Sequence, residues 1–182
     1  MYEMADSIVV KRLVRNLRYR LTYVQVLAAF LKPTPGPEVV QLFNSLMRAQ
    51  QSAIASLTSY LRSLDVDVQD LAPDQRLLEH ASHQQGVRAR LRFVHSGFSK
   101  AVSWYKTQLT DKQMTADPEF RQLLLQLGEI EAAKLWRVEA VMDRLRIPLE
   151  PEPENQRELR HVRPNRDRSW QSRLLEDVGR PA

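Results

Sequence analysis

The chain contains no cysteine, which excludes disulfide bonds, thiolate metal sites and cysteine nucleophiles. Glycine is scarce, with 5 residues among 182, and long segments carry no turn-forming residue, so an all-helical fold is favoured. No stretch approaches the roughly 18 consecutive apolar residues of a membrane-spanning helix, and no basic-then-apolar signal opens the chain. Glycine-rich phosphate loops, zinc-ligand spacings and a Ser-His-Asp order are also missing. We therefore expect a cytoplasmic protein outside the membrane and predict no catalytic residue.

The composition is that of a globular protein. Hydrophobic residues make up 43% of the chain and charged residues 27%, which is enough for one domain with a sizeable core. The net charge of +5 is a mild excess for 182 residues and does not by itself favour nucleic-acid binding. From Pro148 onwards the sequence becomes rich in proline and arginine. We expect a helical domain over residues 1–148 and an extended tail over residues 149–182 that ends in a short amphipathic segment.

Apolar residues that recur every three or four positions predict four long helices. Pro37 and Pro118 each stand at a favourable first helical position, and Asp117 is a good N-cap. The polar stretch 64–75 suits a crossover between two helical hairpins, a helix is expected to resume near Pro73, and Gly86 suggests a break. Residues 110–118 are expected to form a loop. The predicted helices cover residues 6–32, 37–64, 87–109 and 118–146.

Two internal alignments indicate a repeated hairpin. PEVVQLFNSL from Pro37 lies over PEFRQLLLQL from Pro118 at an offset of 81, and LRYRLTYVQVLAAFLK from Leu17 lies over LRFVHSGFSKAVSWYK from Leu91 at an offset of 74. Chance similarity between amphipathic helices is the alternative explanation. The shared Pro-Glu start and the ungapped register favour two copies of one helical hairpin.

The segments FSKAVSWYKTQL and DPEFRQLLLQLGEIEAAKLWRVEAVM resemble the second half of a rubrerythrin-type domain of the ferritin-like family. In that family, Glu residues from the first and third helices and a Glu-x-x-His from each of the second and fourth hold two metal ions. The resemblance covers about residues 8–147. It implies an up-down-down-up four-helix bundle made of the two repeated hairpins with a crossover between them.

The chain departs from that ligand set. Glu131 matches the Glu of the last helix, but Lys134 stands where the histidine belongs, and an ammonium group has no lone pair for a metal. One carboxylate cannot hold two metal ions, so the resemblance implies a degenerate relative without a di-iron centre or any other cofactor. The residues at the six matching positions are Val24, Gln50, Ala53, Phe98, Glu131 and Lys134.

Glu131 and Lys134 are three residues apart on the apolar face of their helix, where a charged pair is costly unless it is satisfied. We predict that they pair in a closed polar cluster with Gln50, while Val24, Ala53 and Phe98 replace ligands with apolar groups. A buried lysine acting as a base or Schiff-base nucleophile is the catalytic alternative.

Other features are weaker candidates. His80 and His83, beside Glu79, have a spacing that suits a surface metal site, although such pairs more often bind nothing. Trp136 lies opposite the apolar stripe, which suggests an oligomer interface. The tail residues that could contact a partner protein or RNA are Arg160, Arg163, Arg166 and Trp170.

These observations favour a non-enzymatic structural or protein-interaction domain that self-associates, with a dimer preferred, and that could meet a protein partner through its tail. Two alternatives remain open. One is a metal-binding or oxidoreductase protein that uses other ligands around Glu131. The other is a nucleic-acid-binding protein that uses its arginine-rich tail and first helix.

Overall fold

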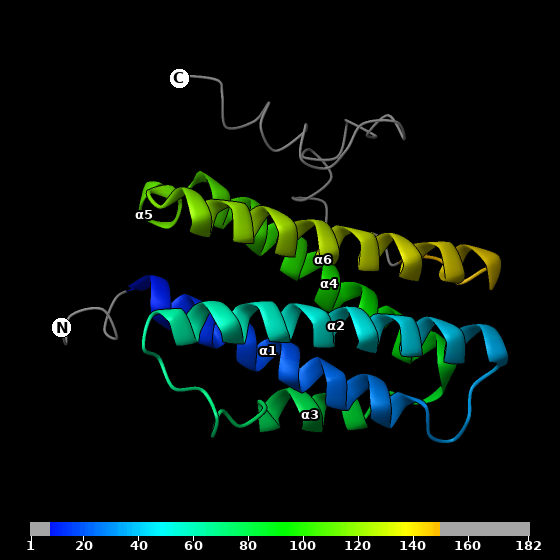
Figure 1. The fold of residues 1–182 in the computed structure, drawn as a ribbon. Helices are drawn as coiled ribbons and strands as arrows, with labels where there is room; N and C mark the ends of the chain where they lie inside the picture. The colour runs from blue at the N-terminus through cyan, green and yellow to red at the C-terminus, as the bar shows by residue number, and fades with distance from the viewer. Residues whose placement is uncertain (1–7, 150–182) are drawn as a thin grey trace. The chain divides into compact units, whose positions relative to one another are not determined.

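A computed structural model gives the fold of residues 8–149 (Figure 1). These residues form helices without any strand, so the all-α prediction is confirmed. None of these helices is both long and apolar enough to cross a membrane. The helices are α1 (Ile8–Phe30), α2 (Pro37–Ser63), α3 (Gln75–Ser82), α4 (Gly86–Thr110), α5 (Lys112–Thr115) and α6 (Pro118–Arg144).

The chain divides into two compact units, residues 1–94 and 95–182, and the boundary falls within α4. The single domain expected over residues 1–148 therefore stays a prediction. The tail predicted over residues 149–182 lies outside the described part of the chain from residue 150 onwards. The same holds for its candidate contact residues, which are Arg160, Arg163, Arg166 and Trp170.

The first unit is built on a hairpin of α1 and α2, which pack antiparallel (Figure 1). α1 ends at Phe30, shortly before Pro33. α2 begins at Pro37, as the sequence predicts, and Gly36 is its N-cap residue. α3 packs against α1. The predicted bounds of 6–32 and 37–64 lie within two residues of the observed ones wherever the ends are described.

Helices α2 and α6 end in the same way, at matching positions of the repeat. Each is 27 residues long, and each is followed by a residue with positive φ: Asp65 at 58° and Arg146 at 52°. The next residue then donates back into the helix, Val66 N to Leu61 O at 3.0 Å and Ile147 N to Met142 O at 2.8 Å. This is the Schellman closure of a helix C-terminus. The offset of 81 therefore holds from the first residue of each helix to its cap.

The correspondence between α1 and α4 is less regular. At the predicted offset of 74, α4 would run from residue 82 to residue 104, whereas it runs from Gly86 to Thr110. Gly86 has a φ of 74°, which an L-residue with a side chain rarely adopts, and it separates α3 from α4 where a break was expected. No proline follows to end α4 as Pro33 follows α1, so α4 continues further.

Residues 64–74 are non-helical, as predicted, and one hydroxyl group ties them to the hairpin. Thr22 Oγ1 on α1 accepts a hydrogen bond from Asp74 N at 2.8 Å and donates to Arg18 O at 2.7 Å. The Asp74 side chain then caps α3 by accepting from Leu77 N at 3.2 Å. The path of this segment is therefore fixed at its C-terminal end.

The second unit contains the rest of α4, together with α5 and α6. The loop expected over residues 110–118 contains the short helix α5, which the sequence reading missed. Asp111 caps α5 through Gln113 N at 2.9 Å, and the fully buried Met114 anchors it. Asp117 caps α6 as predicted, accepting from Glu119 N at 2.8 Å.

Candidate functional site

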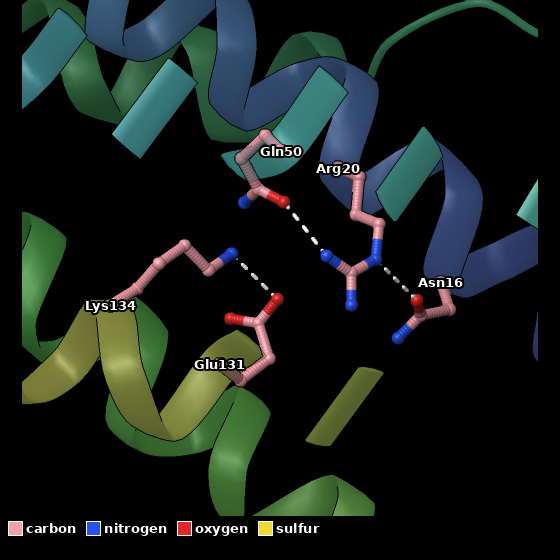
Figure 2. A network of polar contacts seen from close by, with 5 residues as sticks. All are labelled: Asn16, Arg20, Gln50, Glu131 and Lys134. Atoms are coloured by element: carbon pink, nitrogen blue, oxygen red, sulfur yellow. Dashed lines mark hydrogen bonds and ion pairs between the residues drawn. The ribbon is translucent and has the colours of Figure 1, made fainter. Parts of the chain in front are cut away.

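The largest fully buried side chain in the described part of the chain is that of Arg20 on α1, which the sequence reading did not single out. Its Nε donates to Asn16 Oδ1 at 3.0 Å, one helical turn earlier, and its Nη1 donates to Gln50 Oε1 on α2 at 2.9 Å (Figure 2). We call these three residues the Arg20 cluster. Within its own unit, the guanidinium group is thus held by two amide oxygens.

The position of Arg20 follows from the spacing of the core residues on α1. It lies three residues after Leu17 and seven before Leu27, both of which are fully buried, so the helix turns it towards the core. That spacing was the available signal. It was obscured because Arg15 and Arg18, which are exposed, make the same stretch read as a solvated basic surface.

The side-chain amide of Gln50 has one atom with a hydrogen-bond partner and one atom without. Its carbonyl oxygen accepts from Arg20, but its Nε2 atom is buried without a hydrogen-bond partner. A buried donor of this kind costs about 1–3 kcal/mol. Gln50 was expected in a polar cluster with Glu131 and Lys134, and its hydrogen bond within the first unit is to Arg20 on the neighbouring helix.

Glu131 and Lys134 lie one turn apart on α6 and are 0% and 1% exposed. Lys134 Nζ donates to Glu131 Oε1 at 2.6 Å, so the two side chains predicted to pair do form a buried ion pair (Figure 2). The same ammonium group lies 4.5 Å from the centre of the Phe98 ring on α4. A cation over an aromatic face is attracted by the ring quadrupole, and burial strengthens the attraction. We call Phe98, Glu131 and Lys134 the Lys134 cluster.

The donor set of the Lys134 cluster does not fit a di-metal centre. A metal bound through Glu131 would lie beside the ammonium group of Lys134, which repels cations and offers no lone pair while it is protonated. The third member, Phe98, presents a hydrocarbon ring with no ligand atom. In the residues from 8 to 149, no three His, Asp or Glu side chains come together in a way that could hold a metal ion.

The two other residues of the first unit that the resemblance aligned with metal ligands are apolar. Ala53 is fully buried one turn after Gln50. Val24 is only half-buried, and it lines a hollow of about 410 Å³ with Leu71 and Pro73 rather than filling the core. Arg20 thus lies in the core of the unit, whereas Val24, one turn later on α1, lies beside the non-helical segment.

The histidines do not form the surface metal site suggested by their spacing. His80 packs edge-on against Phe93, with ring centres 5.4 Å apart, and His83 is the C-cap residue of α3. Both are exposed, as is Glu79. A third histidine, His95 on α4, contacts Glu139 on α6 at 3.1 Å and so links the two long segments of the second unit.

Trp136 is 66% exposed on α6, as its place opposite the apolar stripe predicts. Alanines surround it at one-turn spacings: Ala132 and Ala133 before it and Ala140 after it. These three residues, one turn before and one turn after the exposed indole ring, have small side chains. Leu145 is 39% exposed because it is the C-cap residue of α6, where the helix ends.

The chain matches no protein-family model, and no curated protein or solved structure is significantly similar to it.

Proposed function

We propose that the chain is a ferritin-like four-helix bundle in which buried cations have replaced the di-metal centre, and that it serves as a structural or protein-interaction domain. The observation that carries this proposal is the Lys134–Glu131 ion pair, which is 2.6 Å long and almost wholly buried. Where the family resemblance places a histidine ligand, this chain has an ammonium group bonded to the one carboxylate that the ligand set retains. Chemistry that depends on a bound metal pair then has no support at this position.

Metal analysis of the full-length protein tests the first half of the proposal. Protein purified after expression with added iron or manganese should contain well under one equivalent of either metal per chain. Its thermal unfolding midpoint should not change on treatment with a chelator. Two equivalents of either metal, removed by chelator with a fall in the midpoint, would overturn the proposal.

A matched variant makes the metal test sharper. Lys134→His restores the Glu-x-x-His spacing on α6 but leaves Gln50, Ala53 and Phe98 as they are. The proposal expects this variant to bind no di-metal centre either, because a single Glu-x-x-His cannot hold two ions. Stoichiometric loading of the variant, with no loading of the natural chain, would show that Lys134 alone excludes the metal and that the other five positions are competent.

The second half of the proposal concerns self-association through the strip formed by Trp136 and its three neighbouring alanines on α6. An exposed tryptophan is typical of an interface, and the small alanine side chains beside it would let a second copy approach closely. Sedimentation analysis should show a dimer that Trp136→Ser converts to a monomer. Leu145→Ser is the matched control, because residue 145 is nine positions further along and hence on the opposite side of the helix. A monomeric natural chain, or equal effects of the two variants, would exclude this interface.

The metal-binding alternative expects further carboxylates or imidazoles around Glu131. Within their unit, Glu131 bonds to the ammonium group of Lys134, and that ammonium group lies over the Phe98 ring. The ammonium group repels a metal cation and the ring offers no ligand atom, so this alternative is not preferred.

A further inference from the structure

The first unit carries a hollow of about 620 Å³ along the N-terminal half of α1. Pockets that hold small molecules have volumes of about 300–1,000 Å³ and combine apolar walls with a few convergent polar groups. This hollow has both kinds of lining. Neither the Arg20 cluster nor the Lys134 cluster contributes a residue to it.

Three cations of α1 line the hollow: Lys11, Arg15 and Arg18. They recur at spacings of three and four residues, which aligns them along one face of the helix. All three are exposed, and in the described residues no ion pair joins Arg15 or Arg18 to a carboxylate. Arginine presents a fork of N–H donors that matches phosphate and carboxylate oxygens, so this edge suits an anion.

The charge distribution along α1 also favours an anion at this edge. From Ile8 to Phe30 the helix has Lys and Arg residues but no Asp or Glu, and its first turn contains no acidic group. Like charges three and four residues apart on one helix face repel one another, and Lys11 also lies near the positive N-terminal end of the helix dipole. A bound anion would relieve this repulsion. The row of exposed cations is not needed to bury the hydrophobic face of α1.

The walls of the hollow are apolar and come from three segments. Val10 and Val14 belong to α1, Val66 follows the closure of α2, and Leu77 belongs to α3. The Val66 N to Leu61 O bond and the Asp74 N to Thr22 Oγ1 bond hold the non-helical segment against the hairpin. The apolar walls are thus supported by hydrogen bonds of the backbone.

Asp74 is the one carboxylate in the lining, and its role is already accounted for. Its side chain accepts from Leu77 N at 3.2 Å and so caps α3. A capping carboxylate interacts favourably with the positive end of the helix it caps, which reduces its repulsion of a nearby anion.

We propose that this hollow binds a single-chain amphiphile with an anionic head group. The head group would lie against Arg15 and Arg18, and the alkyl chain against Val14, Val66 and Leu77. Cations at the rim and hydrocarbon along the walls match the two parts of such a molecule. A free inorganic anion would leave the walls unused, and a neutral detergent would leave the arginines unused. This site is independent of the function proposed above.

Calorimetric titration of the full-length protein tests the proposal, with dodecyl phosphate used at concentrations where it is monomeric. We expect saturable binding of one molecule per chain. Dodecyl maltoside and inorganic phosphate should each bind at least about tenfold more weakly, since each lacks one half of the recognised chemistry. Arg15→Gln combined with Arg18→Gln should weaken dodecyl phosphate binding by about tenfold or more.

The matched control is Arg48→Gln combined with Arg62→Gln, which removes the same charge from exposed positions of α2. It should change the affinity by less than about twofold. Circular dichroism and the unfolding midpoint establish that both double variants are folded.

Several results would overturn the proposal. Equal losses in the two double variants would mean attraction to net charge alone. Equal affinity for dodecyl maltoside would mean an apolar hollow without anion recognition. Binding of inorganic phosphate, of a polyglutamate peptide or of anionic vesicles with no binding of the monomeric amphiphile would assign the arginines to a different partner.

Discussion

Among the described residues, each of the two units buries one cation, and the two cations have different hydrogen-bond partners. In the first unit, Arg20 reaches from α1 to Gln50 on α2 and is held by amide oxygens. In the second, Lys134 bonds to Glu131 on its own helix and lies over the Phe98 ring. Gln50 and Glu131 occupy equivalent positions of the repeat, offset by 81. The same register therefore supplies the acceptor for a buried cation in both units.

At the offset of 81, α2 and α6 share some features and differ in others. Helix length, first residue, C-terminal closure and acceptor position are shared, whereas the cation comes from a different helix in each unit. A neutral amide requires a donor with several N–H groups to form a useful cluster, and arginine has them. A carboxylate accepts a point charge, so a lysine one turn away is sufficient. The acceptor at this register thus differs together with the cation that it binds, an amide with arginine and a carboxylate with lysine.

The largest expected effect comes from removing the charge of the carboxylate. Glu131→Gln keeps the shape of the side chain but leaves the Lys134 ammonium buried without its counter-ion. We expect a loss of about 3–5 kcal/mol in the free energy of unfolding, which is the usual cost of breaking a buried ion pair on one side. Urea denaturation followed by circular dichroism measures it.

Glu129→Gln is the control for that change, because Glu129 lies on the same helix and is only half-buried. It should alter the free energy of unfolding by less than about 0.5 kcal/mol. Similar losses in the two variants would show that the Lys134 cluster is not energetically different from the surface of α6.

The next effect tests whether the first unit needs an arginine in particular. Arg20→Lys preserves the charge but replaces a planar fork by a single ammonium group, which cannot reach Asn16 and Gln50 in the same geometry. The expected loss is about 1–3 kcal/mol, the range for leaving a buried polar group unsatisfied. The comparison variant is Arg18→Lys on the exposed side of α1, where we expect almost no change. If Arg20→Lys were equally neutral, the two clusters would be interchangeable and the comparison would fail.

A smaller effect is expected from the contact between the Lys134 ammonium group and the Phe98 ring in the second unit. The coupling between Phe98→Leu and Lys134→Met, taken from a double-mutant cycle, isolates the contact between the ammonium group and the ring at 4.5 Å. We expect a favourable coupling of about 0.5–2 kcal/mol. The same cycle between Phe120→Leu and Lys134→Met provides the reference for two buried residues of one unit. Coupling that is no larger for Phe98 would remove the ring from the Lys134 cluster.

The sequence predicts the long helices well because prolines and capping residues mark their ends. Pro37, Pro118 and Asp117 place the starts of α2 and α6 at the observed residues. The helix α5 was missed because four residues are too few to show a helical period. At the sites, the charged pair on α6 stood out against apolar neighbours. Arg20 did not, since the exposed arginines beside it hid its core spacing.

The smallest effects concern the helix starts, where the two units differ by one side chain. Asp117 caps α6 by accepting from Glu119 N and Phe120 N, whereas Gly36 at the equivalent position of α2 has no side chain to offer. Asp117→Ala should therefore cost about 1 kcal/mol. Gly36→Asp should increase the free energy of unfolding by a few tenths of a kcal/mol. Gly36 has a φ of −57°, which any residue adopts, and nothing lies within 4 Å of an added Cβ atom.

Thermal unfolding of the two cap variants decides whether the equivalence of α2 and α6 extends to energetics. Gly36→Ala is the control, since it adds the Cβ atom without a hydrogen-bond acceptor. If Gly36→Asp stabilises the protein more than Gly36→Ala does, the aspartate of the second unit works at the matching position of the first. Equal effects of Asp and Ala would show that α2 begins with its first N–H groups satisfied in another way. The correspondence between α2 and α6 would then be limited to the backbone, and the first N–H groups of the two helices would be satisfied in different ways.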